Sequence, residues 1–175
     1  MSNPTTLFTL GPRYCVDTNV IISFLRRSDD EHYGSDVFAP QWAHIERMIA
    51  SSVIVAPRQV ERELGRWTEQ IDTMGSWLRR HSHMFRDMSS PQLEVAKAIV
   101  NRYPAYGSSV NFLGDLEVIT LAAAAEIAVV TMETAHAQSS ASRPKIPSVC
   151  HEFEIDCVTV PGLLRRERFG QTPDQ

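Results

Sequence analysis

The amino-acid sequence predicts an α/β protein built on a central parallel sheet, and two observations lead to this fold class. Short runs rich in β-branched residues alternate along the chain with longer segments of helical periodicity. The short runs are continuously apolar and do not alternate in and out, which is typical of strands covered by helices on both faces. The predicted strands are residues 14–16, 53–55, 128–131 and 157–160.

Helical periodicity fills the segments between the predicted strands. Apolar residues share one face in three helices: Trp42, Ile45 and Ile49 in the first, Val60, Leu64 and Trp67 in the second, and Leu93, Val95, Ala96 and Val100 in the third. Pro57 suits the first position of the second helix, and Ser90 before Pro91 suits the cap of the third. Residues 115–127 are apolar almost all round, which predicts the most buried helix. Pro161 opens the last helix.

The bulk composition indicates one globular domain. The 175 residues contain 43% hydrophobic and 22% charged side chains, without repeats or low-complexity segments. We expect the domain at residues 13–169, between a flexible leader at 1–12 and a flexible tail at 170–175. The most apolar stretch, residues 121–130, is interrupted by Glu126 and is too short to span a bilayer. Three cysteines suit neither a disulfide framework nor a four-ligand zinc site, which favours a reducing, cytoplasmic setting.

The charge balance excludes one way of binding nucleic acid. A formal net charge of −4 is at odds with a protein that holds nucleic acid mainly through a broad basic surface. It does not exclude a nuclease, because such an enzyme can gather carboxylates around metal ions that face the phosphate.

Asp17 is the first candidate for chemistry. It follows the apolar run at residues 14–16, and open α/β sheets bind their ligands at the carboxyl ends of the strands. The alternative is a helix cap, for which Asp17, Thr18 and Asn19 are all suitable residues. One cap needs one such residue, and three occur in succession here. The placement therefore favours a functional role for Asp17.

Three further acids follow a strand, or open or line a helix, at the same end of the predicted sheet. Glu63 borders the apolar stripe of its helix, although a solvated surface position explains it about as well. Asp115 begins the most buried helix, in line with Ile119 and Ala122 and with Glu117 pointing the other way; an N-cap explains it slightly better when it is taken alone. Glu133 follows the strand at 128–131 and taken alone would be an ordinary loop acid.

Asp17, Glu63, Asp115 and Glu133 are all predicted at the same edge of the sheet. This shared position favours a functional role for the four acids together. Carboxylates gathered at one edge of a sheet repel one another unless a divalent cation neutralises them. Oxygen ligands of this kind select hard ions, which predicts Mg²⁺ or Mn²⁺ as the cofactor. Such ions activate water and stabilise the leaving oxygen when a phosphodiester is hydrolysed.

Two long stretches of small and polar residues, 105–114 and 133–145, are expected to lie near this site, because loops of such length in compact domains are usually functional or mobile. Arg143 and Lys145 are candidates for contact with the substrate because their loop follows Glu133.

Several segments, in this order, resemble the PIN-domain nucleases: residues 14–20, the helix from Pro57 through Glu63 and Leu64, Asp115 with Ile119 and Ala122, and residues 129–133. More closely, the chain resembles the PIN-like family DUF4411, through residues 36–38 followed by Trp42 and residues 143–147 followed by Val149 and Cys150. The resemblance extends from about Tyr14 to Leu164, nearly the whole chain.

The resemblance implies a three-layer α/β/α sandwich and a magnesium-dependent endoribonuclease, often the toxin of a toxin–antitoxin pair. It assigns metal and water to Asp17, Glu63, Asp115 and Glu133, with Thr18, Asn19 and Thr131 as polar support. The partners expected are RNA, an antitoxin protein and a second copy of the chain, with no membrane. Glu133 departs from the pattern, since many PIN sequences have Asp there; the longer side chain suggests binding through water.

Two other functions compete with the nuclease. A phosphatase of the haloacid dehalogenase kind also places an Asp after its first strand, but it needs a second Asp two residues later, where this chain has Asn19. A non-enzymatic interaction protein that keeps the fold is the other alternative, and the retained acids argue only weakly against it. A nucleotide-binding module is disfavoured because neither GxxxxGK[ST] nor GxGxxG is present.

Overall fold

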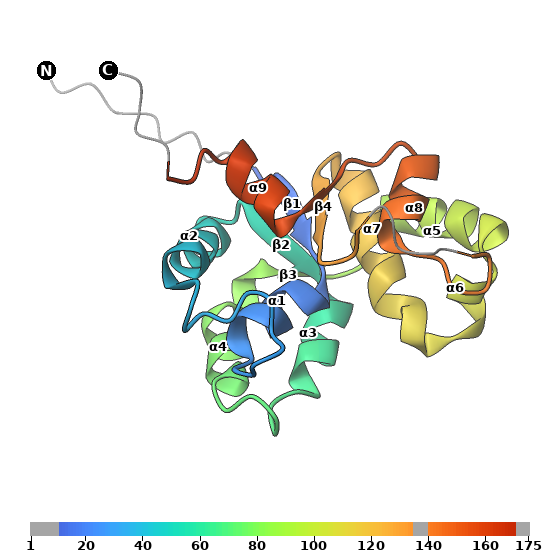
Figure 1. Cartoon of the computed structure of the whole chain (residues 1–175). Helices are drawn as coiled ribbons and strands as arrows, with labels where there is room; N and C mark the ends of the chain where they lie inside the picture. The colour runs from blue at the N-terminus through green and yellow to red at the C-terminus, as the bar shows by residue number, and fades with distance from the viewer. Residues whose placement is uncertain (1–10, 135–139, 171–175) are drawn as a thin grey trace, which may run out of the picture.

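A five-stranded sheet runs through the centre of the protein (Figure 1), as seen in a computed structural model that describes residues 11–134 and 140–170. All strand pairs are parallel, in the order β3-β2-β1-β4-β5. The strands are β1 (Tyr14–Val16), β2 (Ile54–Pro57), β3 (Phe85–Arg86), β4 (Ala128–Thr131) and β5 (Cys157–Thr159). The predicted fold class is confirmed, and so are the predicted positions of four strands; β3 was not predicted.

Helices cover the sheet on both faces. They are α1 (Thr18–Leu25), α2 (Ala39–Ala50), α3 (Arg58–Gly65), α4 (Met74–Arg80), α5 (Ser90–Arg102), α6 (Ala105–Ser108), α7 (Leu113–Ala125), α8 (Ile146–Glu152) and α9 (Val160–Arg166), with the short 3₁₀ turns η1 (Ser82–Met84) and η2 (Val110–Phe112). Parallel crossovers are right-handed, so the helices between β1 and β3 and those between β3 and β5 lie on opposite faces. Figure 1 shows these two groups on either side of the strands, consistent with a three-layer sandwich.

The strand order creates a crevice at the carboxyl ends of β1 and β4. The chain moves outward from β1 to β3, then crosses back to β4 and β5 on the other side of β1. Helices that leave neighbouring strands in opposite directions open a gap at this point, where α/β proteins bind their ligands. The register aligns Val16 with Val130, so Asp17 and Thr131 come next to one another beyond the last paired residues.

The apolar stripe of α2 packs as the sequence predicts: Trp42, Ile45 and Ile49 are buried. Helix α3 buries Val60 and Leu64, but it ends at Gly65, so the third predicted residue, Trp67, lies beyond the helix and is only partly buried. Helix α7 is buried over most of its length and contacts β1, β2 and β4, which makes it the central helix of its layer. The core is therefore continuous from both helical layers through the sheet.

Two predictions about helix starts are wrong. Pro57 ends β2 and precedes α3 as its N-cap, because its extended backbone completes the strand. Ser89, not Ser90, caps α5: its side chain and that of Gln92 form a reciprocal capping box. The helix buries Gln92 and Ile99, whereas Leu93, which was predicted to point inward, is 50% exposed, so this part of the predicted stripe is wrong.

The chain ends are described only in part. The predicted leader and tail lie largely outside the described residues, at 1–10 and 171–175. Within residues 11–134 and 140–170, none of the helices combines the length and apolar character needed to cross a membrane.

Candidate functional site

Asp17 lies at the carboxyl end of β1 and is only 2% exposed. Its amide donates to the carbonyl of Val130 at 2.9 Å, and its Oδ2 accepts a hydrogen bond from Thr131 Oγ1 at 3.2 Å. Although Asp17 is the N-cap residue of α1, its side chain makes no capping hydrogen bond to that helix. Helix capping therefore does not explain why a carboxylate is buried at this position.

Asp115 lies in the first turn of α7, which begins at Leu113 with Phe112 as its N-cap. The alternative that Asp115 caps this helix is therefore wrong. The carboxylate is mostly buried and belongs to a helix that is buried over most of its length, where an acid needs a partner of its own.

Glu63 faces the same region from the last turn of α3. Its Oε2 accepts a hydrogen bond from Thr18 Oγ1 at 2.7 Å, and Gln59 Nε2 lies 3.5 Å from its Oε1. The backbone of Gly114 passes so close that a Cβ atom added there would lie 2.3 Å from Oε1. Glu63 is thus a half-buried, hydrogen-bonded side chain wedged between α3, α1 and the start of α7, and not a freely solvated surface acid.

Glu133 is held by the segment that leads into α8. Its Oε1 accepts from Lys145 Nζ at 2.7 Å, and its Oε2 accepts from the amide of Ile146 at 2.9 Å. Its own amide donates to Thr131 Oγ1 at 3.1 Å. Thr131 therefore connects the backbone of Glu133 to the carboxylate of Asp17.

The supporting residues suggested by the resemblance divide into two groups. Thr18 and Thr131 donate to acids of the cluster, as described above. Asn19 is exposed, because α1 turns its side chain away from the buried face. Arg143 is also exposed, and its backbone pairs with Ser140. Of the two residues proposed to contact substrate, Lys145 thus lies within the acidic cluster.

Burial and mutual repulsion raise the pKa values of the two aspartates. Burial raises the pKa of Asp17 to about 6, with further increases from Glu133 and Glu63, while Thr131 and the Thr18 amide lower it. Burial also raises the pKa of Asp115 to about 8; the charges of Asp17, Glu133 and Glu63 add to this, and Lys145 opposes them. The four acids singled out from the sequence therefore act on one another as one electrostatic cluster.

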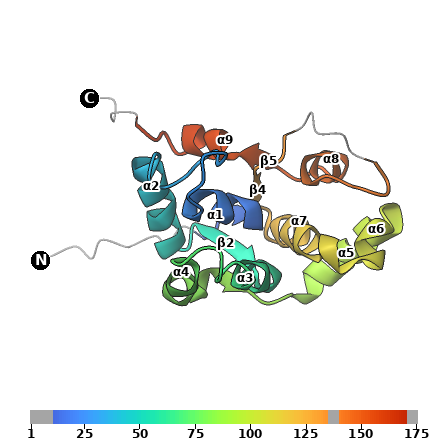
Figure 2. The same cartoon turned by 60° about the horizontal axis from the view of Figure 1, so that its bottom comes forward.

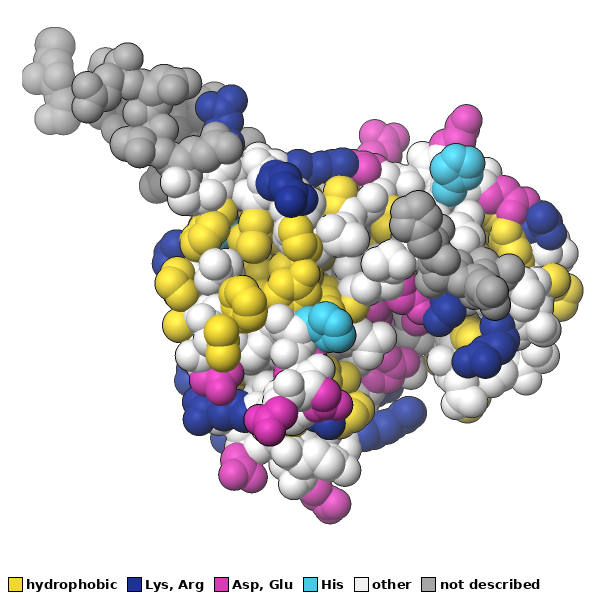
Figure 3. All heavy atoms as spheres, in the orientation of Figure 1, with side chains coloured by type: hydrophobic (Ala, Val, Ile, Leu, Met, Phe, Trp, Pro, Cys, Tyr) yellow, Lys and Arg dark blue, Asp and Glu magenta, His cyan; other side chains and the backbone are white. Residues whose placement is uncertain are grey.

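The space-filling view shows how acidic side chains lie on one face of the molecule. They gather in a hollow between the region of α3 and the region of α6 and α8, with basic side chains near its rim (Figure 3).

The donor set fits a hard divalent cation. Carboxylate oxygens from four elements surround one region, and a cation there would relieve the repulsion that raises the aspartate pKa values. Within the described part of the chain, no three acidic, His or Cys side chains already converge closely enough to hold a metal ion. Glu63 and Glu133 are instead hydrogen-bonded to Thr18 and Lys145, so direct binding would require these two carboxylates to turn.

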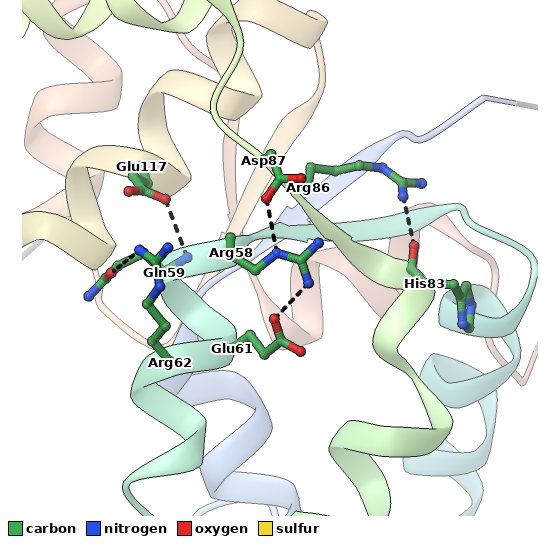
Figure 4. A network of polar contacts seen from close by, with 8 residues as sticks. All are labelled: Arg58, Gln59, Glu61, Arg62, His83, Arg86, Asp87 and Glu117. Atoms are coloured by element: carbon green, nitrogen blue, oxygen red, sulfur yellow. Dashed lines mark hydrogen bonds and ion pairs between the residues drawn. The ribbon is translucent and has the colours of Figure 1, made fainter.

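Glu117 is a buried acid whose place the sequence did not predict. It was expected to point away from the site, but it is 8% exposed, and its Oε2 accepts from the amide of Gln59 at 3.3 Å (Figure 4). The carboxylate thus satisfies a free amide in the first turn of α3, where negative charge is favoured. Glu117 holds the helix that carries Glu63, and Arg58 secures the same helix start through Glu61 and Asp87 (Figure 4).

Tyr106 is the second residue that the sequence did not single out. It is 3% exposed, and its hydroxyl has no hydrogen-bond partner among residues 11–134 and 140–170. A buried, unsatisfied hydroxyl costs about 1–3 kcal/mol. Its only sequence signal was its position in the stretch 105–114, which was expected to lie near the site.

Fold and site together define an α/β protein with a carboxylate cluster at the carboxyl edge of a parallel sheet. The model of the family described as "Domain of unknown function (DUF4411)" matches residues 14–170, and the chain belongs to this family. The suspected DUF4411 membership is therefore confirmed. No protein of curated function matches the chain significantly.

Proposed function

We propose that the protein is an endoribonuclease that depends on Mg²⁺ or Mn²⁺ and hydrolyses RNA phosphodiester bonds. The observation that carries this proposal is the electrostatic cluster itself: burial raises the pKa of Asp115, and the charges of three other acids raise it further. Such an arrangement is costly to the fold, and a divalent cation offsets the cost. The resemblance of the sequence to PIN-domain nucleases supports the same chemistry.

Each residue of the cluster receives a role in this proposal. Asp17 and Asp115 hold the cation, and Glu63 and Glu133 bind it directly or through water. The cation would lower the pKa of water and stabilise the charge that develops on the phosphate. Thr131 orients Asp17, and Thr18 orients Glu63, through the hydrogen bonds described above. Lys145 keeps Glu133 in place and offers positive charge to the RNA backbone.

The proposed partners follow from the resemblance. RNA is the substrate, a small antitoxin protein is the proposed inhibitor, and a second copy of the chain forms a homodimer. The proposed setting is the cytoplasm.

RNA cleavage with and without metal tests this function. We expect the purified protein to cut structured RNA in the presence of Mg²⁺ and to lose this activity in EDTA, because the carboxylates alone supply no Lewis acid. Asp115→Asn should be inactive under both conditions. Equal cleavage by wild type and Asp115→Asn would contradict the proposal and favour an interaction protein with the same fold.

Gly114→Ala should reduce RNA cleavage without unfolding the protein. The new Cβ would lie within 2.7 Å of three atoms of the Glu63 carboxylate, so the end of this side chain must move away. We expect cleavage to fall by about 10–100-fold, as when a group that orients a metal ligand is lost. The initial cleavage rate and the melting temperature measure the two effects separately.

Gly65→Ala is the matched control for this substitution. Gly65 is in the last turn of α3, and a Cβ there meets no heavy atom within 4 Å. Its replacement should leave cleavage unchanged and slightly favour the helix. Equal cleavage by both variants would show that the position of Glu63 does not matter for activity.

A further inference from the structure

Tyr106 lies in a small aromatic group with Phe112, the N-cap residue of the helix α7 that carries Asp115 in its first turn. It belongs to α6, which packs at the end of α5, with α8 across from it (Figure 2). The rings of Tyr103 and Phe112 pack edge-on against its ring, with centroids 6.4 and 5.9 Å away. A Cβ on Gly107 would lie 2.9 Å from Val100 Cγ1, so the glycine allows α6 to approach α5 closely. The tyrosine ring is therefore fixed in place.

The hydroxyl of Tyr106 serves no purpose in the packing. Its oxygen is buried and has no hydrogen-bond partner in the part of the chain that the structure describes, so Phe would fill the same space without an unsatisfied group. Tyr103, in the same aromatic group, shows the usual solution, because its hydroxyl donates to the carboxylate of Glu152. A hydroxyl retained at Tyr106 calls for a partner that comes from outside the protein.

The surroundings of this hydroxyl indicate which kind of partner fits. Burial raises the pKa of Tyr106, and the charges of Asp115 and Glu133 are among the groups that raise it further. The phenol therefore keeps its proton and acts as a hydrogen-bond donor on the side of Asp115 and Glu133. None of these carboxylates makes a direct hydrogen bond with it within the described residues, and a water between such groups can satisfy all of them.

We propose that Tyr106 is a positioning residue of the cation site, where its hydroxyl donates a hydrogen bond to a water in the hydration shell of a divalent cation held by Asp115 and Glu133. This inference rests on the proposed metal-dependent function. It accounts for a hydroxyl that is unsatisfied in the protein alone, because the acceptor arrives together with the cation. Outer groups of this kind orient the ligands of a metal and strengthen its binding.

Binding of Mn²⁺ to the full-length chain tests the proposal, because it needs no knowledge of the RNA target. Titration calorimetry, or the loss of the free-ion signal in electron paramagnetic resonance, gives the dissociation constant. We expect Tyr106→Phe to weaken Mn²⁺ binding by about 10-fold. In EDTA its melting temperature should equal or exceed that of wild type, because the substitution removes a group that is unsatisfied without the cation. The melting-temperature gain on adding Mn²⁺ should be smaller in the variant.

Tyr103→Phe is the matched control. It removes a hydroxyl from the same aromatic group, but this hydroxyl already has Glu152 as its acceptor. We expect the control to leave Mn²⁺ binding unchanged and to lower the melting temperature in EDTA.

Two results would overturn this inference alone, and a third would overturn the proposed function as well. Equal Mn²⁺ binding by wild type and Tyr106→Phe would refute it while leaving the cation site intact. A drop in the melting temperature of Tyr106→Phe in EDTA, with no change in Mn²⁺ affinity, would assign the hydroxyl to a structural water instead. Failure of wild type itself to bind Mn²⁺ would refute the proposed function as well.

Discussion

Asp17→Asn is expected to abolish metal-dependent RNA cleavage. The substitution preserves the shape of the side chain, and an amide oxygen can still accept the hydrogen bond of Thr131. It removes the negative charge that would hold the cation at the end of β1. Loss of an outer group around a metal costs about 10–100-fold, so we expect loss of a direct ligand to lower the cleavage rate by at least about 100-fold. Initial rates on a fixed RNA, with Mg²⁺ varied, measure this effect.

Stability measurements distinguish this loss from unfolding. In EDTA at pH 7.5 the variant should be at least as stable as wild type, because a neutral amide replaces a buried carboxylate whose pKa is raised to about 6. Asp72→Asn, at an exposed position, is the control and should match wild type in both measurements. Cleavage by Asp17→Asn at the rate of this control would rule out Asp17 as a metal ligand.

Local sequence patterns were sufficient to predict most of the sheet. Strands β1 and β4 are short apolar runs at the expected positions, because a strand buried on both faces needs apolar residues throughout. Strand β5 also lies at its expected position, although it is an edge strand and only partly buried. Strand β3 has only two residues, Phe85 and Arg86, and so few residues leave no pattern. It is a strand because β2 offers an edge to pair with, which is a property of the folded chain.

Helix starts and helix faces were less predictable. The consecutive residues Ser89 and Ser90 are both suitable caps, and the choice between them depends on the side chain of Gln92. The face that α5 buries depends on the elements packed against it, so Gln92 and Ile99 are buried whereas Leu93 is exposed. The orientation of Glu117 was wrong for a different reason: its partner is an amide at the start of α3, far away in the sequence.

The candidate site was predictable to the extent that topology determines it. Asp17 follows a central strand, and Asp115 lies in the first turn of a buried helix, so their positions follow from the order of elements. The contact between Glu133 and Lys145, the wedge of Gly114 against Glu63, and the unsatisfied hydroxyl of Tyr106 depend on how side chains from separate elements meet. No local pattern carries that information.

Without metal, the protein is expected to lose stability between pH 6 and pH 8 because of Asp115. Its carboxyl has a pKa near 3.8 in the unfolded chain and about 8 in the folded protein. Between these values the folded state binds a proton that the unfolded state lacks, so the free energy of unfolding falls as the pH rises. Below pH 4 both states are protonated, so the stability that comes from this group is fully present and no longer changes with pH. The fall from pH 6 to pH 8 amounts to about 2 kcal/mol, at about 1.4 kcal/mol per pH unit while the folded proton is retained.

Comparison of wild type with Asp115→Asn isolates this effect. His44 and His81 have pKa values lowered by burial, so they add stability as the pH rises through 6.5 and partly mask the trend of Asp115. Both proteins contain these histidines, and the difference between their unfolding free energies in EDTA cancels them. Asp115→Asn should therefore gain about 2 kcal/mol over wild type between pH 6 and pH 8, measured by urea denaturation. Saturating Mg²⁺ should remove most of this gain, because the cation favours the charged carboxylate of wild type. Parallel curves for the two proteins in EDTA would mean that burial and the neighbouring acids do not raise the pKa of Asp115, and the electrostatic argument for a cation at this site would fail.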